Sequence, residues 1–404
     1  MQAIARRHSV LPLTRWHDRL VAIDGSGKLP ESHPVSIRAA AMRRDRNNFR
    51  VHPAPTEWMS KSKKRPVGTG DRAPDDLREL VAFFEGMDEG RERFRWTLRD
   101  SLDELLDGQR TGRWCYQHLM KTEKTHLGTA IEINLSREFD IEDGLYLDWS
   151  VAGAELDCKF SRDIGGWEIP MEMYVCSDHD TRSGIDDFPA LLVWMNDDTS
   201  EWAAGLLRIS DQRLRWNQGT HDEAIRGYNR DNKRRIALAA LDEIYWLWSG
   251  LQRDLPPNLL LNLAPEVRER ILRPASSGQG RVNDLFRNVQ DQVVERAVVL
   301  TVGQQDDAPK RVRDARTHLR AEGIIILGHE LPHQRVAQSL GLPQAPKGSW
   351  ISTRVIPTEE QGGGGFCIDG RWWKRASLSD PVAAAPKFPK VWNELQERSG
   401  LGSA

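Results

Sequence analysis

Hydrophobic residues recur along the first half of the chain with two different periods. Over residues 75–108 they fall at three- and four-residue intervals, which predicts two amphipathic helices, and residues 123–139 show the same helical spacing. Over residues 145–160 apolar and polar positions alternate on either side of a short turn, as in a β-hairpin. Short apolar runs at 190–195 and 203–209 predict two further strands. Helices combined with strands in this way indicate an α/β domain.

A second set of elements follows in the C-terminal half. Helical spacing over 281–301 predicts one long helix, and residues 306–320 predict another, with basic residues on adjoining faces. Strand-like runs follow at 324–327 and 350–356. Helix, helix and then a strand pair is the order of a winged helix-turn-helix, so we expect a DNA-binding domain over residues 236–360.

The remaining segments suggest where the domains begin and end. Residues 1–75 contain several prolines and glycines and lack sustained periodicity, so we expect an irregular extension with one short helix near 36–44. The first domain is expected over 76–228. The polar and basic stretch 210–235 is either an inter-domain connection or a DNA-facing loop. Residues 361–404 are rich in glycine and proline and are expected to form a peripheral tail.

Composition narrows the class of protein. Hydrophobic residues make up 39% of the 404 residues, which is enough for folded domains with extensive cores. No run of about 18 apolar residues is present, so a membrane-spanning helix is not expected. The four cysteines (Cys115, Cys158, Cys176 and Cys367) include no closely spaced pair, which argues against a disulfide framework or a structural zinc site. We therefore expect a cytoplasmic protein.

Positive charge is concentrated at the N-terminus. Residues 1–75 contain 15 lysines and arginines against 7 acidic residues, although the whole chain has a formal charge of −2. Such a segment attracts nucleic acid phosphates in a salt-dependent way. A solvated leader with no partner has the same composition, so this segment alone does not identify a DNA-binding protein.

The candidate chemistry lies in the predicted hairpin, at Asp148 and at the tripeptide Asp157-Cys158-Lys159. On a strand, Asp157 and Lys159 point to the same face with Cα atoms roughly 6.6 Å apart, while Cys158 points into the core. The hairpin can bring Asp148 opposite Asp157. Two converging carboxylates favour a cation, and Mg²⁺ prefers oxygen ligands. A nearby lysine can hold or deprotonate the attacking water, or stabilise charge on a phosphate.

The same short pattern has a simpler interpretation. An exposed Asp–Lys pair on a surface hairpin would contribute little energy and carry no chemistry. Glu132, on the preceding helix, turns away from the apolar face of that helix, so its spacing alone indicates an exposed carboxylate. The alternation that places Asp157 and Lys159 on one face makes a metal site physically possible.

The chain resembles the NaeI-type (type IIE) restriction endonucleases over roughly residues 90–350. The stretches that carry the resemblance are KTEKTHLGTAIEINLSREF from Lys121, LDWSVAGAELDCKFS from Leu147, GGWEIP from Gly165, NRDNKR from Asn229, GQGRVNDLFRNVQ from Gly278, QQDDAPKRVR from Gln304 and EGIIILGH from Glu322. Matches of this length in the same order are specific to the family. The basic extension lies outside them.

The resemblance implies a nuclease core of the PD-(D/E)xK kind, with a mixed sheet flanked by helices, acting as a homodimer on double-stranded DNA. The catalytic set of the family falls on Glu132, Asp148, Asp157 and Lys159. Asp148 and Asp157 would hold Mg²⁺, Glu132 would support them, and Lys159 would assist the water. Leu147 stands where the name of the superfamily has proline. A winged-helix module near 281–330 would bind a second copy of the site and activate cleavage.

Candidate DNA contacts are the basic residues of the second predicted helix, Lys310, Arg311, Arg313 and Arg316. A solvated helix face is the alternative. Trp372 and Trp373 are expected to pack in a small satellite core rather than contact DNA. Two functions remain open: a sequence-specific endonuclease, or a DNA-binding regulator whose nuclease core is inactive or only nicks. The complete catalytic set, with three carboxylates and one lysine, favours the interpretation as an endonuclease.

Overall fold

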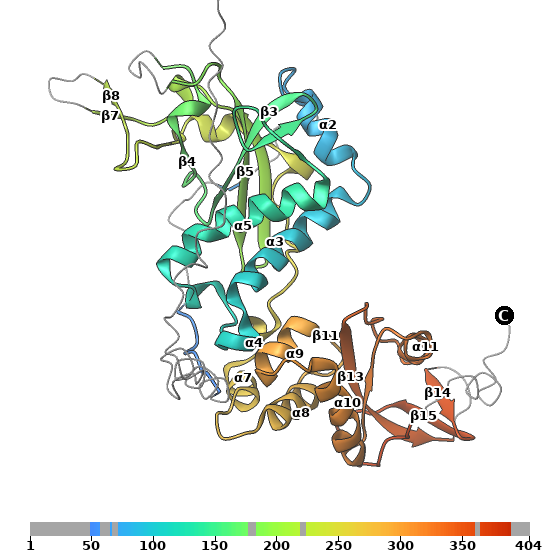
Figure 1. Ribbon diagram of the computed structural model, residues 1–404. Coiled ribbons are helices and arrows are strands. Elements are labelled where there is room, and N and C mark those ends of the chain that lie inside the picture. Colours follow the sequence, from blue (N-terminus) through green and yellow to red (C-terminus); the bar gives the residue numbers. More distant parts are fainter. Residues whose placement is uncertain are drawn as a thin grey trace, which may run out of the picture. The chain divides into compact units, whose positions relative to one another are not determined.

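The computed structural model (Figure 1) describes residues 49–56, 65–66, 72–176, 183–218, 224–359 and 364–388. Phe49–Ala404 cluster into one compact unit. Most of the basic extension, including the short helix expected near 36–44, lies outside the described residues. None of the helices in the described part of the chain combines the length and apolar character that a membrane span requires.

A six-stranded sheet forms the centre of the N-terminal half of this unit. Its strands lie in the order β1-β2-β3-β5-β6-β10, with β3 and β5 parallel and the other neighbours antiparallel. The strands expected at 190–195 and 203–209 are confirmed as β5 and β6, and the hairpin as β2 and β3. The bounds are β1 (Glu142–Asp143), β2 (Trp149–Val151), β3 (Ala154–Ser161), β5 (Pro189–Asn196), β6 (Glu201–Arg208) and β10 (Tyr245–Trp246).

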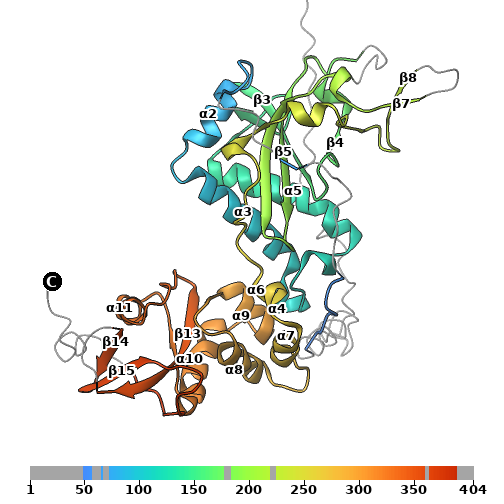
Figure 2. The same cartoon turned by 180° about the vertical axis from the view of Figure 1, so that it is seen from behind.

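Helices cover one face of this sheet (Figure 1 and Figure 2). Their apolar sides meet the sheet in a core that includes Phe84, Leu98 and Ile131 together with Leu191 and Val193 of β5. The burial of this apolar surface is what holds the helices against the sheet. The three helices expected before residue 140 are confirmed. The bounds are α2 (Arg78–Gly86), α3 (Gly90–Leu106) and α5 (Lys121–Phe139), with the short α4 (Gly108–Thr111) after α3.

The opposite face of the sheet packs against largely irregular chain. Its core includes Trp167, Trp194, Leu214 and Ile236, so the polar stretch 210–235 is part of the first domain and does not link two domains. Two small strand pairs lie here, β4 (Glu168–Ile169) with β9 (Arg234–Arg235), and β7 (Trp216–Gln218) with β8 (Ala224–Arg226).

The first domain therefore extends past residue 228, where it was expected to end, and past residue 236, where the second domain was expected to begin. Tyr245 and Trp246 form β10, which pairs with β6, and Leu255 is still buried in the helical core. The basic residues that suggested a linker include Arg234, which is fully buried and paired with Asp211. Leu260 is the first buried residue after this region that belongs to the C-terminal core.

In the C-terminal half, the long helix expected over 281–301 is two helices separated by a strand. Asp291 adopts a left-handed φ of 64°, and the β-branched residues after it form β11, which pairs with β13. The helix expected over 306–320 and the two strands after it are confirmed. The bounds are α6 (Leu259–Asn262), α7 (Pro265–Ile271), α8 (Gly278–Asn288), β11 (Val293–Glu295), α9 (Arg296–Gly303), α10 (Ala308–His318), β12 (Ile324–Leu327), α11 (Leu331–Ser339) and β13 (Ser349–Thr358).

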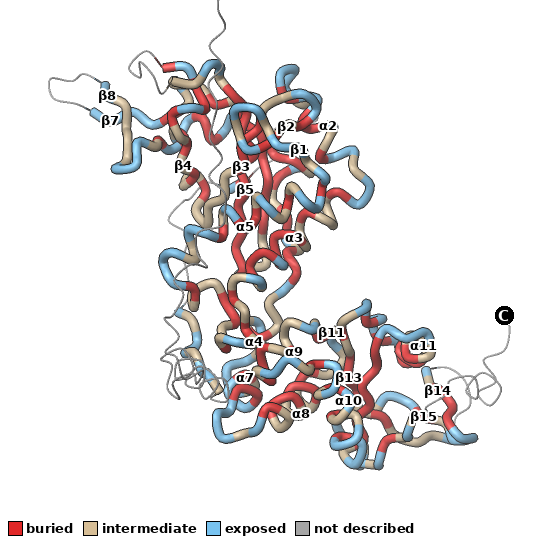
Figure 3. Tube along the Cα trace, viewed as in Figure 1, coloured by how far each residue is buried: buried red, intermediate tan, exposed pale blue. Residues whose placement is uncertain are grey.

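Part of the expected peripheral tail is structural. β14 (Gly365–Ile368) and β15 (Arg371–Arg375) extend the second sheet, whose order is β11-β13-β15-β14, with β12 also paired to β13. Trp373 packs in the last core cluster with Phe366 and Ala385, as expected for a satellite core, whereas Trp372 is only partly buried and is not part of this cluster. Figure 3 shows buried chain reaching into these C-terminal strands. Gly364 and Gly370, both with positive φ, lie in the turns on either side of β14, so the glycine content of this segment does not exclude strands.

Candidate active site

A tight β-hairpin sets the geometry of the candidate site. Ala152 and Gly153, between β2 and β3, both have positive φ, 51° and 78°, as in the two-residue turns that suit the twist of a hairpin. Trp149 is paired with Leu156, so the next position in the same register places Asp148 opposite Asp157. Directly opposed residues share one face of an antiparallel pair. The hairpin therefore brings the two carboxylates together, as the sequence indicated.

The alternation along β3 separates core residues from polar ones. Leu156 and Cys158 are buried in the helical core, whereas Asp157 and Lys159 lie on the opposite face, beside Ala190 and Leu192 of β5. Burial raises the pKa of the Cys158 thiol, and the negative charges of its neighbours raise it further. The burial of Cys158 confirms the expectation that its side chain points into the core.

Asp157 is a buried carboxyl with a cation beside it. Its side chain is only 5% exposed, and the Lys159 ammonium contacts it directly. Burial raises the pKa of Asp157 to about 7, because the stabilisation by Lys159 is smaller than the cost of desolvation and Asp148 adds repulsion. Burial disfavours the Lys159 ammonium, but the carboxylates of Asp157 and Asp148 raise the pKa of Lys159 overall. Lys159 is therefore charged at neutral pH.

Glu132 lies on α5, near Asp148 and Lys159. Its side chain is partly buried, and burial together with Asp148 raises its pKa, while Lys159 has the opposite effect. One helical turn earlier, Gly128 lies beside β3, since a Cβ at this position would be in ordinary van der Waals contact with the Cβ of Phe160, at 3.7 Å. Glu132 is thus an electrostatic neighbour of Asp148 and Lys159, and the exposed carboxylate indicated by helical spacing alone is not observed.

The donor set suits a cation that keeps part of its water shell. Among the described residues, no three histidine, cysteine, aspartate or glutamate side chains are arranged to hold a metal together. The two opposed carboxylates of Asp148 and Asp157 offer oxygen ligands and excess negative charge. One or two carboxylates, with water and phosphate oxygens, is the usual way in which proteins hold Mg²⁺. The residues therefore fit Mg²⁺ better than a fully enclosed metal.

Glu155 is the polar residue of this hairpin that the sequence interpretation missed. It lies on β3 two positions before Asp157, so it shares the face of Asp157 and Lys159. Its carboxylate accepts hydrogen bonds from the backbone N–H groups of Leu145, Tyr146 and Leu147. The period-two spacing Glu155–Asp157–Lys159 was the available signal.

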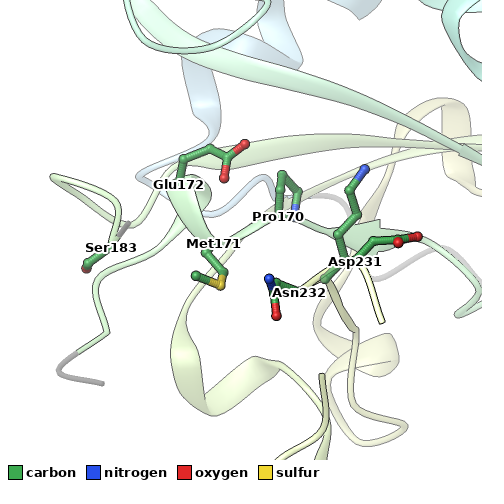
Figure 4. A pocket seen from close by; sticks show the side chains of 7 residues that line it. Pro170, Met171, Glu172, Ser183, Asp231 and Asn232 are labelled. Carbon is green, nitrogen blue, oxygen red and sulfur yellow. The ribbon is translucent and has the colours of Figure 1, made fainter. Parts of the chain in front are cut away.

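A separate pocket of about 350 Å³ lies beside β4 and β9 (Figure 4). It is lined by Pro170, Met171, Glu172, Ser183, Asp231, Asn232 and Lys233. None of the four predicted catalytic residues lines it. The side chain of Asn229 accepts hydrogen bonds from the N–H groups of Asp231 and Lys233 and so shapes one wall of the pocket.

The four basic residues predicted to contact DNA have different surroundings on α10. Lys310 and Arg313 are exposed. Arg311 pairs with Asp307 at 2.6 Å within the helix, and Arg316 is turned inward, where its Nε donates to the carbonyl of Ile326 at 2.9 Å. Lys310 and Arg313 are therefore the two that reach outward without such an intramolecular role.

The first domain, a mixed sheet flanked by helices with carboxylates and a lysine gathered on a central hairpin, is compatible with a nuclease core. Comparison with known proteins supports this classification as a nuclease. The family model described as "Restriction endonuclease NaeI" matches residues 78–384. The chain is 42% identical over 327 residues to the type II restriction enzyme NaeI of Lentzea aerocolonigenes, and the alignment covers 78% of this chain and 95% of that protein. The chain belongs to the NaeI family of restriction endonucleases, which confirms the resemblance noted in the sequence.

Proposed function

We propose that this protein is a Mg²⁺-dependent endonuclease that hydrolyses both strands of double-stranded DNA at a specific base sequence. One observation carries the proposal: Asp148 lies opposite Asp157 on a hairpin that also aligns Lys159 on the same face. Membership of the NaeI family supports the same chemistry.

In this proposal each side chain has a distinct task. Asp148 and Asp157 would hold the metal ion. When bound, a divalent cation neutralises charge at the scissile phosphate. Lys159 is charged at neutral pH, so it donates hydrogen bonds that orient the attacking water and stabilise negative charge on the phosphate, and it does not act as the base. Glu132 adds negative potential that retains the cation and the Lys159 proton.

The C-terminal half supports a second DNA-binding function. We infer a winged helix-turn-helix from the element order α8, β11, α9, α10, β12, β13, in which β13 pairs with both β11 and β12. In that arrangement α10 is the recognition helix, and its exposed Lys310 and Arg313 would contact DNA. We propose that this module binds a second copy of the recognition sequence, that this binding activates cleavage, and that the enzyme acts as a homodimer.

A plasmid cleavage assay tests the catalytic part of the proposal. Purified protein with Mg²⁺ should convert supercoiled plasmid to discrete linear fragments, and sequencing of their ends should return one recognition sequence. Asp157→Ala should bind the same DNA without cutting it. Binding without cleavage by the wild-type protein on DNA of mixed sequence would instead indicate a regulator with an inactive nuclease core.

The activation step needs a different experiment. A short duplex that carries the recognition sequence should accelerate cleavage of a plasmid site that is cut slowly. The double variant Lys310→Ala/Arg313→Ala should lose this acceleration and retain the basal rate. An unchanged cleavage rate on addition of the duplex to the wild-type enzyme would remove the activator role of the C-terminal module.

A further inference from the structure

The carboxylate of Glu155 holds the chain segment that leads into Asp148. Its Oε1 accepts the N–H of Leu145 at 2.8 Å, and its Oε2 accepts the N–H groups of Tyr146 and Leu147 at 2.9 and 2.8 Å. These three consecutive N–H groups lie in the loop before β2, where no strand partner is available to them. Hydrogen bonds to an ionised acceptor are about twice as strong as neutral ones.

The loop is built closely around this carboxylate. A Cβ on Gly144 would lie 2.7 Å from Oε2 of Glu155 and 2.5 Å from the carbonyl oxygen of Leu147, so a side chain at this position would break the arrangement. The Gly144 N–H also donates to the carbonyl of Asp148 at 3.3 Å. Leu145 and Tyr146 are 80% and 58% exposed, so their side chains bury little apolar surface, whereas Leu147 packs against the sheet core.

Glu155 and Asp157 lie on the same strand face, two residues apart, and Asp148 follows directly after the loop that Glu155 binds. We propose that Glu155 is a positioning residue: by binding these three N–H groups, it holds the Asp148 carboxylate opposite Asp157 before any metal arrives. It does not itself ligate the metal or contact the phosphate. This inference rests on the proposed function for the roles of Asp148 and Asp157, whereas the hydrogen bonds do not depend on that function.

Hydrogen exchange on the metal-free protein tests the clamp directly. Glu155→Gln keeps the shape of the side chain but turns an NH₂ group toward N–H donors, so exchange at the amides of Leu145 to Leu147 should rise about tenfold or more. Glu142→Gln is the matched control, because Glu142 is an exposed carboxylate on the adjoining strand β1 and its replacement removes the same charge. It should leave these amides unchanged.

Cleavage measured against Mg²⁺ concentration tests the consequence. Glu155→Gln should need about tenfold more Mg²⁺ for its half-maximal rate and recover much of the wild-type rate at saturation, with DNA affinity in Mg²⁺-free buffer unchanged. Glu155→Asp keeps the charge on a shorter side chain and should fall between wild type and Glu155→Gln in both measurements. It also serves as the test if Glu155→Gln does not fold.

Hydrogen exchange and the Mg²⁺ dependence of cleavage together test whether Glu155 positions Asp148. Unchanged exchange at Leu145 to Leu147 in the Glu155 variants would refute the clamp. Faster exchange with a wild-type Mg²⁺ requirement would refute its role in positioning Asp148. Absence of cleavage by the wild-type enzyme would overturn the proposed function, and the positioning role with it, while the exchange result would still report on the clamp itself.

Discussion

Replacement of Asp157 by asparagine should stabilise the metal-free protein while abolishing cleavage. The side chain is 5% exposed, and burial raises its pKa to about 7, although Lys159 contacts it. In the unfolded chain the same group ionises near its ordinary pKa of 3.8. Between about pH 4 and pH 7 the folded protein keeps a proton that the unfolded chain has lost. The free energy of unfolding therefore decreases as the pH rises through this range.

The size of the effect follows from the two pKa values. The pKa of Asp157 is about 7 in the folded protein and 3.8 in the unfolded chain. At about 1.4 kcal/mol for each pH unit, this difference lowers the free energy of unfolding of the wild type by about 4 kcal/mol at pH 8. Asparagine resembles the protonated carboxyl, so Asp157→Asn should recover up to this amount. Lys159 keeps a partner in the variant, because Asp148 also raises its pKa. The gain should vanish below about pH 4, where both states of the wild type are protonated.

Urea unfolding in EDTA, followed by tryptophan fluorescence at pH 4 and pH 8, measures this difference. At pH 8 the midpoint for Asp157→Asn should exceed that of the wild type, and thermal unfolding should move upward by about 2–4 °C per kcal/mol. Addition of Mg²⁺ should stabilise the wild type and not the variant. A metal-free variant that is less stable than the wild type at pH 8 would refute the claim that burial outweighs the ion pair with Lys159.

Four further outcomes are expected. Lys159→Met should lower the cleavage rate about a hundred- to a thousand-fold without loss of DNA affinity, as measured by single-turnover cleavage and anisotropy; an equal loss in both would point to a binding role. The cleavage rate at low Mg²⁺ should fall as the pH drops through about 7, because Asp157 takes up a proton, and the midpoint should move to lower pH as Mg²⁺ is raised, because metal and proton compete for one carboxylate; a midpoint insensitive to Mg²⁺ would contradict this. Arg234→Met should destabilise the first domain by about 3 kcal/mol in urea unfolding, since Arg234 is fully buried, pairs with Asp211 and stacks on the Trp216 ring at 5.1 Å; a change under about 1 kcal/mol would show that the pair contributes little. Lys310→Ala/Arg313→Ala should reduce the slope of log affinity against log salt by about 2 for duplex DNA bound by the C-terminal module, whereas Arg311→Ala should leave it nearly unchanged because Arg311 is paired with Asp307; equal effects would show that α10 does not face the DNA as proposed.

The helices and strands of the first domain were predictable because each repeats its own period in a short window. The spacing over 123–139 and the alternation over 154–160 correspond to α5 and β3 within two residues. The predictions failed where local signals allow two structures. Valines near residue 293 suit a helix or a strand, and only pairing with β13 decides for the strand.

The end of the first domain was also mispredicted because the local signals there allow two structures. Arginines in 226–235 are typical of an exposed linker, yet Arg226 and Arg234 both pair with Asp211, and Arg234 is fully buried. A sequence window cannot show that a charge has a buried partner several residues away. Glycines and prolines over 361–404 indicate a tail by composition, but β15 pairs with β13 and is therefore part of the sheet.

The sequence by itself determined that Asp157 and Lys159 share a face of one strand, because side-chain direction along a strand is a local, period-two property. Only the tertiary structure decided the environment of the side chains on that face. Burial of Asp157 against β5 and the approach of Glu132 on α5 depend on residues far apart in the chain. The clamp of Glu155 on the loop before Asp148 depends on the hairpin register and on backbone N–H groups, which residue types do not reveal. A short stretch of sequence therefore locates the candidate site, whereas the electrostatics of the candidate site depend on the folded chain.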